Sequence, residues 1–449
     1  MMHQVFRLSL AIVLTLFLTA GCSRGSTTLV PAGATTSPIT SATRLPLATS
    51  TNASAVSTSG ATPTSTSNVG STPEPSSSSP TASSAGGTGE VIFAGDVVEQ
   101  IDPSDQAGSL PSRVYVAGVN GTPAHSLTAG PKDGSPIWSS DGKRIAYISE
   151  AGPSVIVMQA DGTDAQTVFH GEVTAISWSP DGKQLALSGT PIPPPDKVYG
   201  DQIYLVPLDG SEPRNLSQSE DADTWPAWSP DGKRIAFLRP LPNSFYNAMY
   251  LMNADGSDQH QLTSSDVPVV NVEPDWLPWS PDGRSLLFHE ISFSDGTPAA
   301  NVAPAVLSLD VINVDGTNLR RISAKEEEDI FPRWSPDSQQ ILFTRGLRVD
   351  QTGTIPSIYV MRADGSNVRR LTDGTTPAGS GAWSPDGSHI VYFGGIEQAT
   401  PGAASPVSQI EVADLFVMNS DGSNPRVVVQ NVIGPADLAT GIAWRPGTK

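Results

Sequence analysis

The chain has 449 residues and carries 45 Asp and Glu residues against 26 Lys and Arg residues, for a formal net charge of −19. A surface this acidic repels nucleic-acid phosphates and anionic lipid headgroups, which argues against nucleic-acid binding and against electrostatic docking on a membrane. A single cysteine excludes an intrachain disulfide and a cysteine-rich zinc site.

The N-terminal segment has the pattern of a secretory signal. Residues 1–21 read "MMHQVFRLSLAIVLTLFLTAG", with Arg7 before an apolar stretch over 8–18. The sequence "LTAGC" resembles a bacterial lipobox, which implies a lipoprotein signal peptide over 1–21 with Cys22 as the lipid acceptor. The protein would then be anchored to a membrane without spanning it. The alternative is an ordinary signal peptide followed by a free cysteine.

Residues 22–89 consist almost entirely of Ser, Thr, Ala, Gly and Pro, as in "STSNVGSTPEPSSSSPTASSAGG". Such a segment cannot bury enough apolar surface to offset its chain entropy, so we expect a disordered tether. A flexible chain of about 66 residues has a mean end-to-end distance of roughly 45 Å. The tether would hold the remaining residues, 90–449, away from the membrane.

One five-residue sequence, WSPDG, recurs through the rest of the chain. It stands at 178–182, 228–232, 279–283 and 383–387, with close variants at 138–142, 334–338 and 444–447. Ser-Pro-Asp-Gly is typical of a tight turn, because proline presets φ, aspartate bonds the local backbone and glycine adopts a positive φ. A second Asx-Gly pair lies between successive copies. These pairs are Asn120-Gly121, Asp161-Gly162, Asp209-Gly210, Asp255-Gly256, Asp315-Gly316, Asp364-Gly365 and Asp421-Gly422.

Each repeat predicts four short antiparallel strands, the first of which ends at the tryptophan. Repeats of about 40–60 residues are typical of propeller blades. Residues 441–444 predict a first strand with nothing after it, whereas 90–95, 113–118 and 125–128 predict three strands with no first strand. We therefore predict an all-β, seven-bladed β-propeller of four-stranded antiparallel blades, closed by pairing of the N- and C-terminal strands.

The repeats resemble those of the TolB-type β-propeller family, whose unit reads P-x-W-S-P-D-G-x-x-I-x-F followed by I-Y-V-M-x-x-D-G-S-x-x-x-x-L-T. Residues 331–345, "FPRWSPDSQQILFTR", and 357–372, "SIYVMRADGSNVRRLT", match it closely. The resemblance covers 90–449 and implies the fold. TolB itself has six blades and an additional N-terminal domain, where this chain has a Ser/Thr-rich segment. Related repeats occur in propellers of prolyl oligopeptidase relatives, which carry an α/β-hydrolase domain, but residues 90–449 contain no GxSxG sequence.

Insertions gather on one predicted face. The turns after the first and third strands of a blade lie on one face of a propeller, and the connections after the second and fourth strands lie on the other. The second face carries the insertions, at 96–112, 188–201, 239–247, 289–307, 345–356 and 395–413. Variable loops on a rigid scaffold commonly carry binding residues, so we predict that this is the working face.

Acidic and aromatic residues precede several of the motif tryptophans on this face. The candidate ligand- or partner-binding residues are Asp133, Asp223, Asp275, Asp329, Trp225, Trp276 and Phe331. We expect them to form an acidic, aromatic-edged funnel at the mouth of the central channel, suited to a basic peptide, an amine or a cation. The alternative is solvated loop charge with packing between blades. The turn residues of the motif itself are expected to be structural.

These features predict a monomeric protein of the bacterial cell envelope, lipid-anchored and extracytoplasmic, that binds an envelope protein or an extracellular ligand. We assign no catalytic residue and no resident cofactor. The alternative is a metal-assisted hydrolase or lyase with a divalent cation at the channel mouth. For that alternative, His170 and Glu172 form the nearest ligand pair, in a predicted connection between blades.

Overall fold

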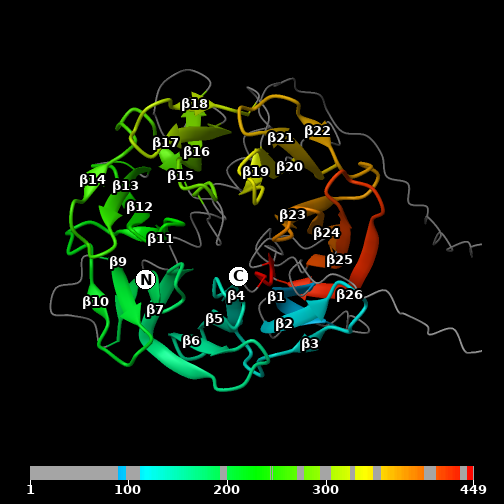
Figure 1. The fold of residues 1–449 in the computed structure, drawn as a ribbon, viewed down its shortest axis with the longest axis horizontal. Helices are drawn as coiled ribbons and strands as arrows, with labels where there is room; N and C mark the ends of the chain where they lie inside the picture. The colour runs from blue at the N-terminus through cyan, green and yellow to red at the C-terminus, as the bar shows by residue number, and fades with distance from the viewer. Residues whose placement is uncertain are drawn as a thin grey trace, which may run out of the picture. The chain divides into compact units, whose positions relative to one another are not determined.

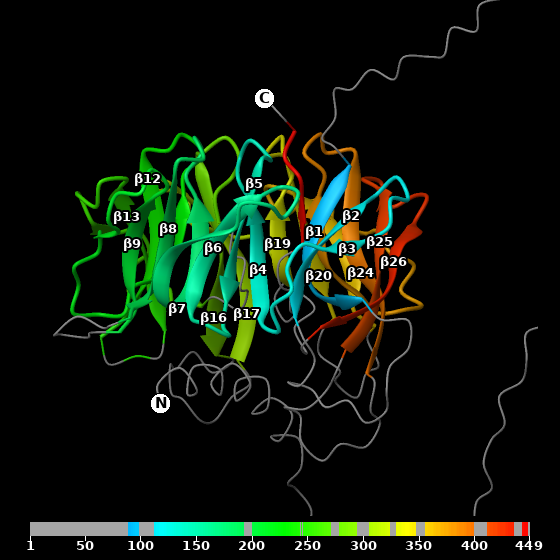
Figure 2. The same cartoon turned by 90° about the horizontal axis from the view of Figure 1, so that it is seen from below.

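A computed structural model describes residues 89–97, 112–192, 200–242, 244, 246–270, 278–293, 305–323, 329–346, 355–398, 411–434 and 442–447. Every regular element in these residues is a β-strand, which confirms the predicted all-β class. Figure 1 shows the sheets following one another around a central axis, and Figure 2 shows their strands from the side. No helix within the described ranges is long and apolar enough to cross a membrane.

The strands pair antiparallel in four sheets. The first sheet contains β4 (Asp133–Trp138), β5 (Arg144–Ser149), β6 (Ser154–Gln159), β7 (Gln166–Trp178), β8 (Gln184–Pro191), β9 (Gln202–Pro207) and β10 (Arg214–Asn215). The second contains β11 (Thr224–Trp228), β12 (Arg234–Pro240), β13 (Asn247–Asn253), β14 (His260–Gln261), β15 (Val269–Val270), β16 (Ser285–Phe293), β17 (Ala305–Asn313) and β18 (Arg320–Arg321). The third contains β19 (Asp329–Trp334), β20 (Gln340–Arg345), β21 (Ser357–Arg362) and β22 (Arg369–Arg370). The fourth contains β23 (Ala378–Trp383), β24 (His389–Gln398), β25 (Glu411–Asn419), β26 (Arg426–Gly434), β27 (Ala443–Trp444), β1 (Glu90–Val97), β2 (Arg113–Gly118) and β3 (His125–Ser126).

Within these sheets the strands group into four-stranded units, which we call blades. The β4 blade consists of β4, β5, β6 and the first part of β7, and the β7 blade consists of the rest of β7 with β8, β9 and β10. The β11, β19 and β23 blades each contain four consecutive strands. In the β16 blade the first strand is reduced to a single bridge between Trp279 and Leu286.

The Ser-Pro-Asp-Gly sequence closes the turn between the first two strands of a blade, as predicted. In the β7 blade the Ser179 hydroxyl donates to the Asp181 carboxylate (2.7 Å), which also accepts the Lys183 N–H (3.0 Å). The Gln184 N–H donates to the Ser179 hydroxyl (3.0 Å), and Gly182 has a φ of 69°. The same hydrogen bonds recur at 139–144, 229–234, 280–285, 335–340 and 384–389.

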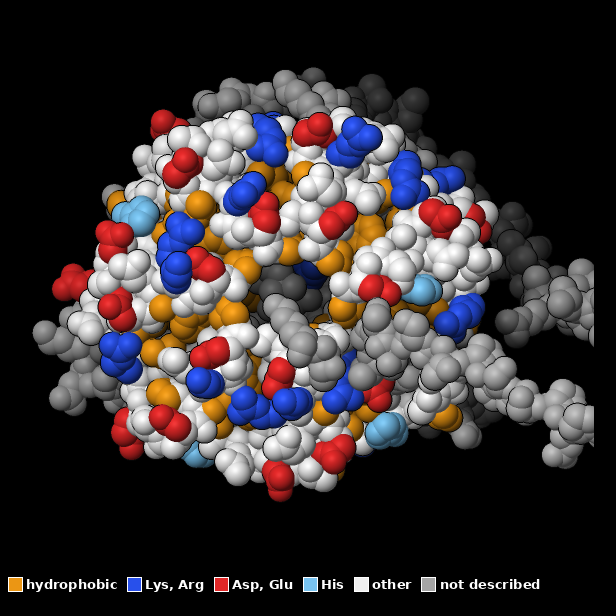
Figure 3. Space-filling view, in the orientation of Figure 1, with side chains coloured by type: hydrophobic (Ala, Val, Ile, Leu, Met, Phe, Trp, Pro, Cys, Tyr) orange, Lys and Arg blue, Asp and Glu red, His pale blue; other side chains and the backbone are white. Residues whose placement is uncertain are grey.

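The tryptophan of the motif joins successive blades. The indole N–H of Trp178 donates to the Ile137 carbonyl of the preceding blade at 3.2 Å. The same bond to the preceding blade is made by Trp279, Trp334, Trp383 and Trp444. Apolar clusters fill the space between blades, as where Val155 of the β4 blade packs with Trp178 and Leu187 of the β7 blade. Figure 3 shows that the molecule is hollowed at the centre of the face in view.

The two ends of the described body lie in one blade. Strand β27 pairs antiparallel with β1, with Trp444 opposite Val91 and Ala443 opposite Ile92, so the predicted terminal pairing is present. The Arg445 guanidinium bonds Glu90 at 2.5 Å. These contacts connect the last described strand to the first.

Two expectations about the connections are wrong. His170 and Glu172 lie within β7, which runs without a break from the outer strand of the β4 blade to the inner strand of the β7 blade. They are not in a loop, because the chain passes between these two blades in extended conformation. Strands also extend into the predicted insertions. The β16–β17 hairpin, for example, continues to the pair Phe293 and Ala305.

Candidate functional site

Three acidic residues predicted to line the channel mouth lie where the first strands of their blades begin. Asp133 and Asp329 are the first residues of β4 and β19, and Asp223 directly precedes β11. All three are buried, with exposed fractions of 3% for Asp133 and 0% for the other two. Three further predicted site residues lie outside the part of the chain that the structure describes: Cys22, Asp275 and Trp276.

In two blades an arginine on the second strand binds this carboxylate. Arg239 Nε and Nη2 each lie 2.7 Å from an oxygen of Asp223. Arg345 Nε and Nη2 lie 2.6 and 2.8 Å from the oxygens of Asp329. Both contacts are bidentate, the geometry in which a planar guanidinium matches a carboxylate best. Because the arginine side chains are only 16% exposed, each pair is largely withdrawn from water.

The arginines also lie over aromatic rings. The Arg239 Cζ is 5.3 Å from the centre of the Phe237 ring and 4.8 Å from that of Tyr250. Arg345 lies 5.1 Å from each of the two equivalent rings on β20 and β21. Burial raises the pKa of the Asp223 carboxyl, and the hydrogen bond and charge of Arg239 oppose that shift. Each carboxylate therefore holds an arginine of its own blade, and a ligand would have to displace that arginine to reach it.

The sequence contained a signal for these pairs. Arg239 and Arg345 each follow a motif tryptophan by eleven residues, in the same two repeats that carry Asp223 and Asp329 five residues before the tryptophan. Antiparallel pairing brings the two positions together, because Asp329 lies directly opposite Arg345. The acidic residues alone do not indicate these pairs, because the arginine partners follow only from the register of the second strand.

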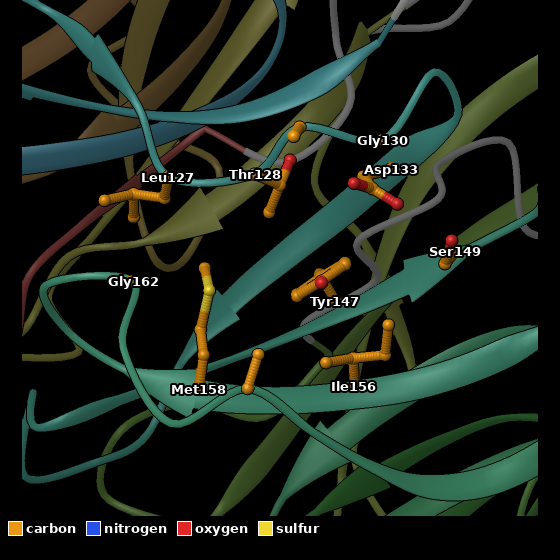
Figure 4. A pocket seen from close by; sticks show the side chains of 11 residues that line it. Leu127, Thr128, Gly130, Asp133, Tyr147, Ser149, Ile156, Met158 and Gly162 are labelled. Atoms are coloured by element: carbon orange, nitrogen blue, oxygen red, sulfur yellow. The ribbon is translucent and has the colours of Figure 1, made fainter.

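The β4 blade has the acidic residue without the arginine. Asp133 lies opposite Ser149, in the register that pairs Asp329 with Arg345. An open pocket of about 330 Å³ lies here, lined by Asp133, Tyr147, Ser149, Ile156 and residues 127–130 of the preceding connection. Figure 4 shows the Asp133 carboxylate in the space between Gly130, Tyr147 and Ser149. Asp133 thus lines an open pocket.

Two hydrogen bonds to Ser112 fix the backbone of Asp133. The Asp133 N–H donates to the Ser112 carbonyl (2.9 Å), and the Asp133 carbonyl accepts a bond from the Ser112 hydroxyl (2.9 Å). A side chain at Gly130 would clash with the carboxylate, so glycine leaves the room it occupies. Burial raises the pKa of Tyr147 to about 12, and the negative charge of Asp133 adds to the shift. The phenol therefore stays neutral beside the carboxylate.

The two described aromatic candidates, Trp225 and Phe331, lie at irregular points of their strands. Their φ angles are 56° and 52°, and the pairing register shifts at each of them. The Trp225 N–H donates to the Ser188 hydroxyl of the preceding blade (3.2 Å), and its half-buried ring packs on the core between the β11 and β16 blades. The irregular pairing accounts for both positions, and core packing adds to it for Trp225.

A second acidic group lies in the β16 blade. Glu290 occupies the position that arginine holds in the β11 and β19 blades, and Asp310 lies nearby on β17. Burial raises the pKa of both carboxyls, and their mutual repulsion adds to the shift at Glu290. Arg321 Nη2 lies 3.4 Å from Glu290. Among the described residues, no three His, Cys, Asp or Glu side chains lie close enough together to hold a metal ion.

Comparison with known proteins places part of the chain in a family. Residues 100–240 match the family model described as PD40, TolB beta propeller domain. An uncharacterized protein of Agrobacterium fabrum is 29% identical over 215 residues, covering 46% of this chain and 64% of that protein. The uncharacterized peptidase YuxL of Bacillus subtilis is 24% identical over 203 residues, covering 39% of this chain and 30% of that protein. The chain thus spans less than two thirds of the length of these curated relatives.

A solved structure with a similar fold is that of puromycin hydrolase. It superposes with a TM-score of 0.55 at 14% sequence identity, over 78% of this chain and 53% of the hydrolase. At this identity the likeness is one of fold.

Proposed function

Because the chain carries a TolB-type β-propeller domain, we propose that it is a binding or scaffold protein that engages an envelope protein or an extracellular ligand through one face of the propeller. We further propose that the ring has seven blades and is closed by the pairing of β27 with β1. The signal sequence and Cys22 support a lipid anchor on the extracytoplasmic side of a bacterial membrane. Residues 22–89 would then be the tether, and the protein would act as a monomer.

The difference between the two ends of the blades carries the proposal. At one end, the Ser-Pro-Asp-Gly turns share the same hydrogen bonds in blade after blade. At the other end, the connections between second and third strands differ widely in length. The β5–β6 connection spans 150–153, whereas the β20–β21 and β24–β25 connections span 346–356 and 399–410. Uniform turns stiffen the scaffold, and variable connections on one face supply specificity.

A hydrolase is the second candidate. Two of the similar proteins are named a peptidase and a hydrolase, and the half-buried Glu290 and the buried Asp310 have the raised pKa values often found at catalytic sites. This chain matches only part of those proteins, and buried carboxyls of this kind also occur in structural ion-pair networks. We therefore favour binding.

Affinity capture tests the proposal. The full chain, in detergent, would capture proteins from the native envelope beside a variant in which 346–356 and 399–410 are replaced by Gly-Ser segments of equal length. A matched control changes Lys143, Lys183 and Lys233, which are exposed at the uniform turns, to serine. We expect a partner that the loop variant loses and the control keeps. Loss in the control alone would contradict the assigned face. Hydrolysis of envelope peptides or saccharides without a captured partner would favour the enzyme.

A further inference from the structure

We propose that the pocket at Asp133 is a binding site for a guanidinium group on an alkyl stem, supplied from outside the chain. The proposal deepens the proposed function by naming the group that a partner would present. It rests on the proposed function only where the guanidinium comes from a polypeptide partner; binding of a small guanidinium compound does not depend on that function.

Three blades carry an acidic residue at equivalent positions. The β4, β11 and β19 blades each place a buried aspartate at the start of the first strand: Asp133, Asp223 and Asp329. The residue opposite it on the second strand is arginine in the β11 and β19 blades and Ser149 in the β4 blade. The β4 blade therefore keeps the carboxylate but has replaced the cation.

The surroundings of the missing arginine are largely kept as well. In the β19 blade, the arginine lies over both Phe343 on the second strand and Tyr359 on the third, which are directly opposite each other and whose rings stack with their centres 5.7 Å apart. In the β4 blade, Tyr147 and Ile156 occupy the same two positions. The surface under the arginine is thus half aromatic and half aliphatic in the β4 blade, and both side chains line the pocket of about 330 Å³ (Figure 4).

The charge of Asp133 supplies the driving force. The carboxylate belongs to a residue that is only 3% exposed, and no ion pair joins it to a lysine or arginine in the described ranges. A buried carboxylate is costly unless it is paired with a cation or fully hydrogen-bonded. A bound guanidinium would provide the pairing that Arg239 and Arg345 provide in their own blades.

The geometry favours a guanidinium over an ammonium group. In the β11 and β19 blades, two N–H groups of the planar arginine guanidinium bind the aspartate carboxylate bidentately, at 2.6–2.8 Å. A lysine ammonium is a compact and strongly hydrated charge that cannot form this fork or stack on a ring in the same way. Ile156 and Met158 offer apolar contact for the alkyl stem.

Isothermal titration calorimetry on the full chain would test the site. The probes are N-acetyl-arginine amide, its lysine counterpart, and the peptide Gly-Gly-Arg-Gly-Gly. The variants are Asp133→Asn, which removes the charge, and Ser149→Arg, which supplies the arginine from within the blade. Asp266→Asn, at an exposed position, makes the same charge change elsewhere. Thermal unfolding of each variant confirms that it is folded.

We expect the arginine probes to bind the parent chain and Asp266→Asn at least ten-fold more tightly than the lysine probe binds. Both pocket variants should weaken arginine binding at least ten-fold, and Ser149→Arg should also raise the melting temperature. Equal binding of arginine and lysine, unchanged binding in Asp133→Asn, or failure of every arginine probe to bind would overturn the proposal.

The two sources of the group give different results. Tight binding of the peptide alone indicates a polypeptide, and equal binding of the free amide indicates a small molecule. Capturing envelope proteins with Ser149→Arg separates this proposal from the proposed function. A partner that is retained while the arginine probe is lost would support a scaffold that does not use this site. Arginine binding without any captured partner would leave the pocket standing and contradict the scaffold.

Discussion

Replacing Arg239 with methionine should destabilise the protein by about 3 kcal/mol at pH 7, because it leaves the Asp223 carboxylate buried without its partner. Asp223 is fully buried, and the two bonds it would lose are each 2.7 Å long. Removing one member of a buried pair typically costs about 3–5 kcal/mol. We take the lower end because the arginine side chain is 16% exposed, so water can partly replace it. Urea unfolding followed by tryptophan fluorescence would measure the loss.

The loss should depend on pH in a definite direction. Burial already raises the pKa of Asp223, and removing Arg239 removes groups that lower it. An acid whose pKa is higher in the folded state than in the unfolded state binds more protons when folded, so folding is favoured as the pH falls through that window. The destabilisation of Arg239→Met relative to the parent should therefore shrink between pH 7 and pH 4.

The double variant Asp223→Leu/Arg239→Met is the matched control. It removes both charges and keeps apolar volume, so its stability should lie within about 1 kcal/mol of the parent. A single variant as stable as the parent, or a loss that does not change with pH, would refute the description of this pair as a buried, mutually dependent unit.

Three further predictions concern other parts of the body. Burial lowers the pKa of His289 to about 4, so the folded state binds fewer protons than the unfolded state between about pH 6.5 and 4. The parent should lose up to about 3 kcal/mol across that range, and a folded His289→Asn variant should show a flatter urea-unfolding profile. Trp444→Ala should cost about 3–5 kcal/mol, because it removes a buried indole that donates to the Ala382 carbonyl of the β23 blade. Deletion of 437–449 should lower the melting temperature clearly, because it removes the β27–β1 pairing; a deletion variant that melts with the parent would contradict this closure. Hydrogen bonds from the Lys183 N–H and the Ser179 hydroxyl lower the pKa of Asp181, so the stability added by its negative charge is present above about pH 4 and is lost as the pH falls below that. Asp181→Ala should cost about 1 kcal/mol at pH 7 and less at pH 2, by urea unfolding at each pH.

Features that depend on neighbouring residues were predictable from the sequence. The turn at Ser179 to Gly182 forms from bonds among residues at most five apart, so its four letters carry the information. The pairing of the C-terminal strand β27 with the N-terminal strand β1 was predictable because the repeats at the two ends of the chain each lack the strands that the other supplies. The role of Trp178 in joining blades also followed, since a large aromatic residue recurs once in each unit.

Features that depend on strand register were not predictable from the acidic residues alone. Whether Asp133 faces a cation or a cavity depends on the residue sixteen positions later, on the neighbouring strand. The continuity of β7 depends on whether the chain loops between blades or passes straight across. Gly171 marks that passage, because a Cβ there would meet the backbone of the neighbouring β8. A glycine alone does not distinguish the two courses.

The unequal sharing of strands between blades has a consequence for cooperativity. Strand β7 belongs to two blades, β15 connects β13 to β16, and β26 pairs with β1, so these blades are hydrogen-bonded in couples. In the described residues, the β19 blade shares no strand with a neighbour. Coupled blades should open together in hydrogen–deuterium exchange, whereas β19 to β22 should exchange as a separate unit of lower protection. The ring would then open first at the β19 blade, which contains Asp329 and its arginine.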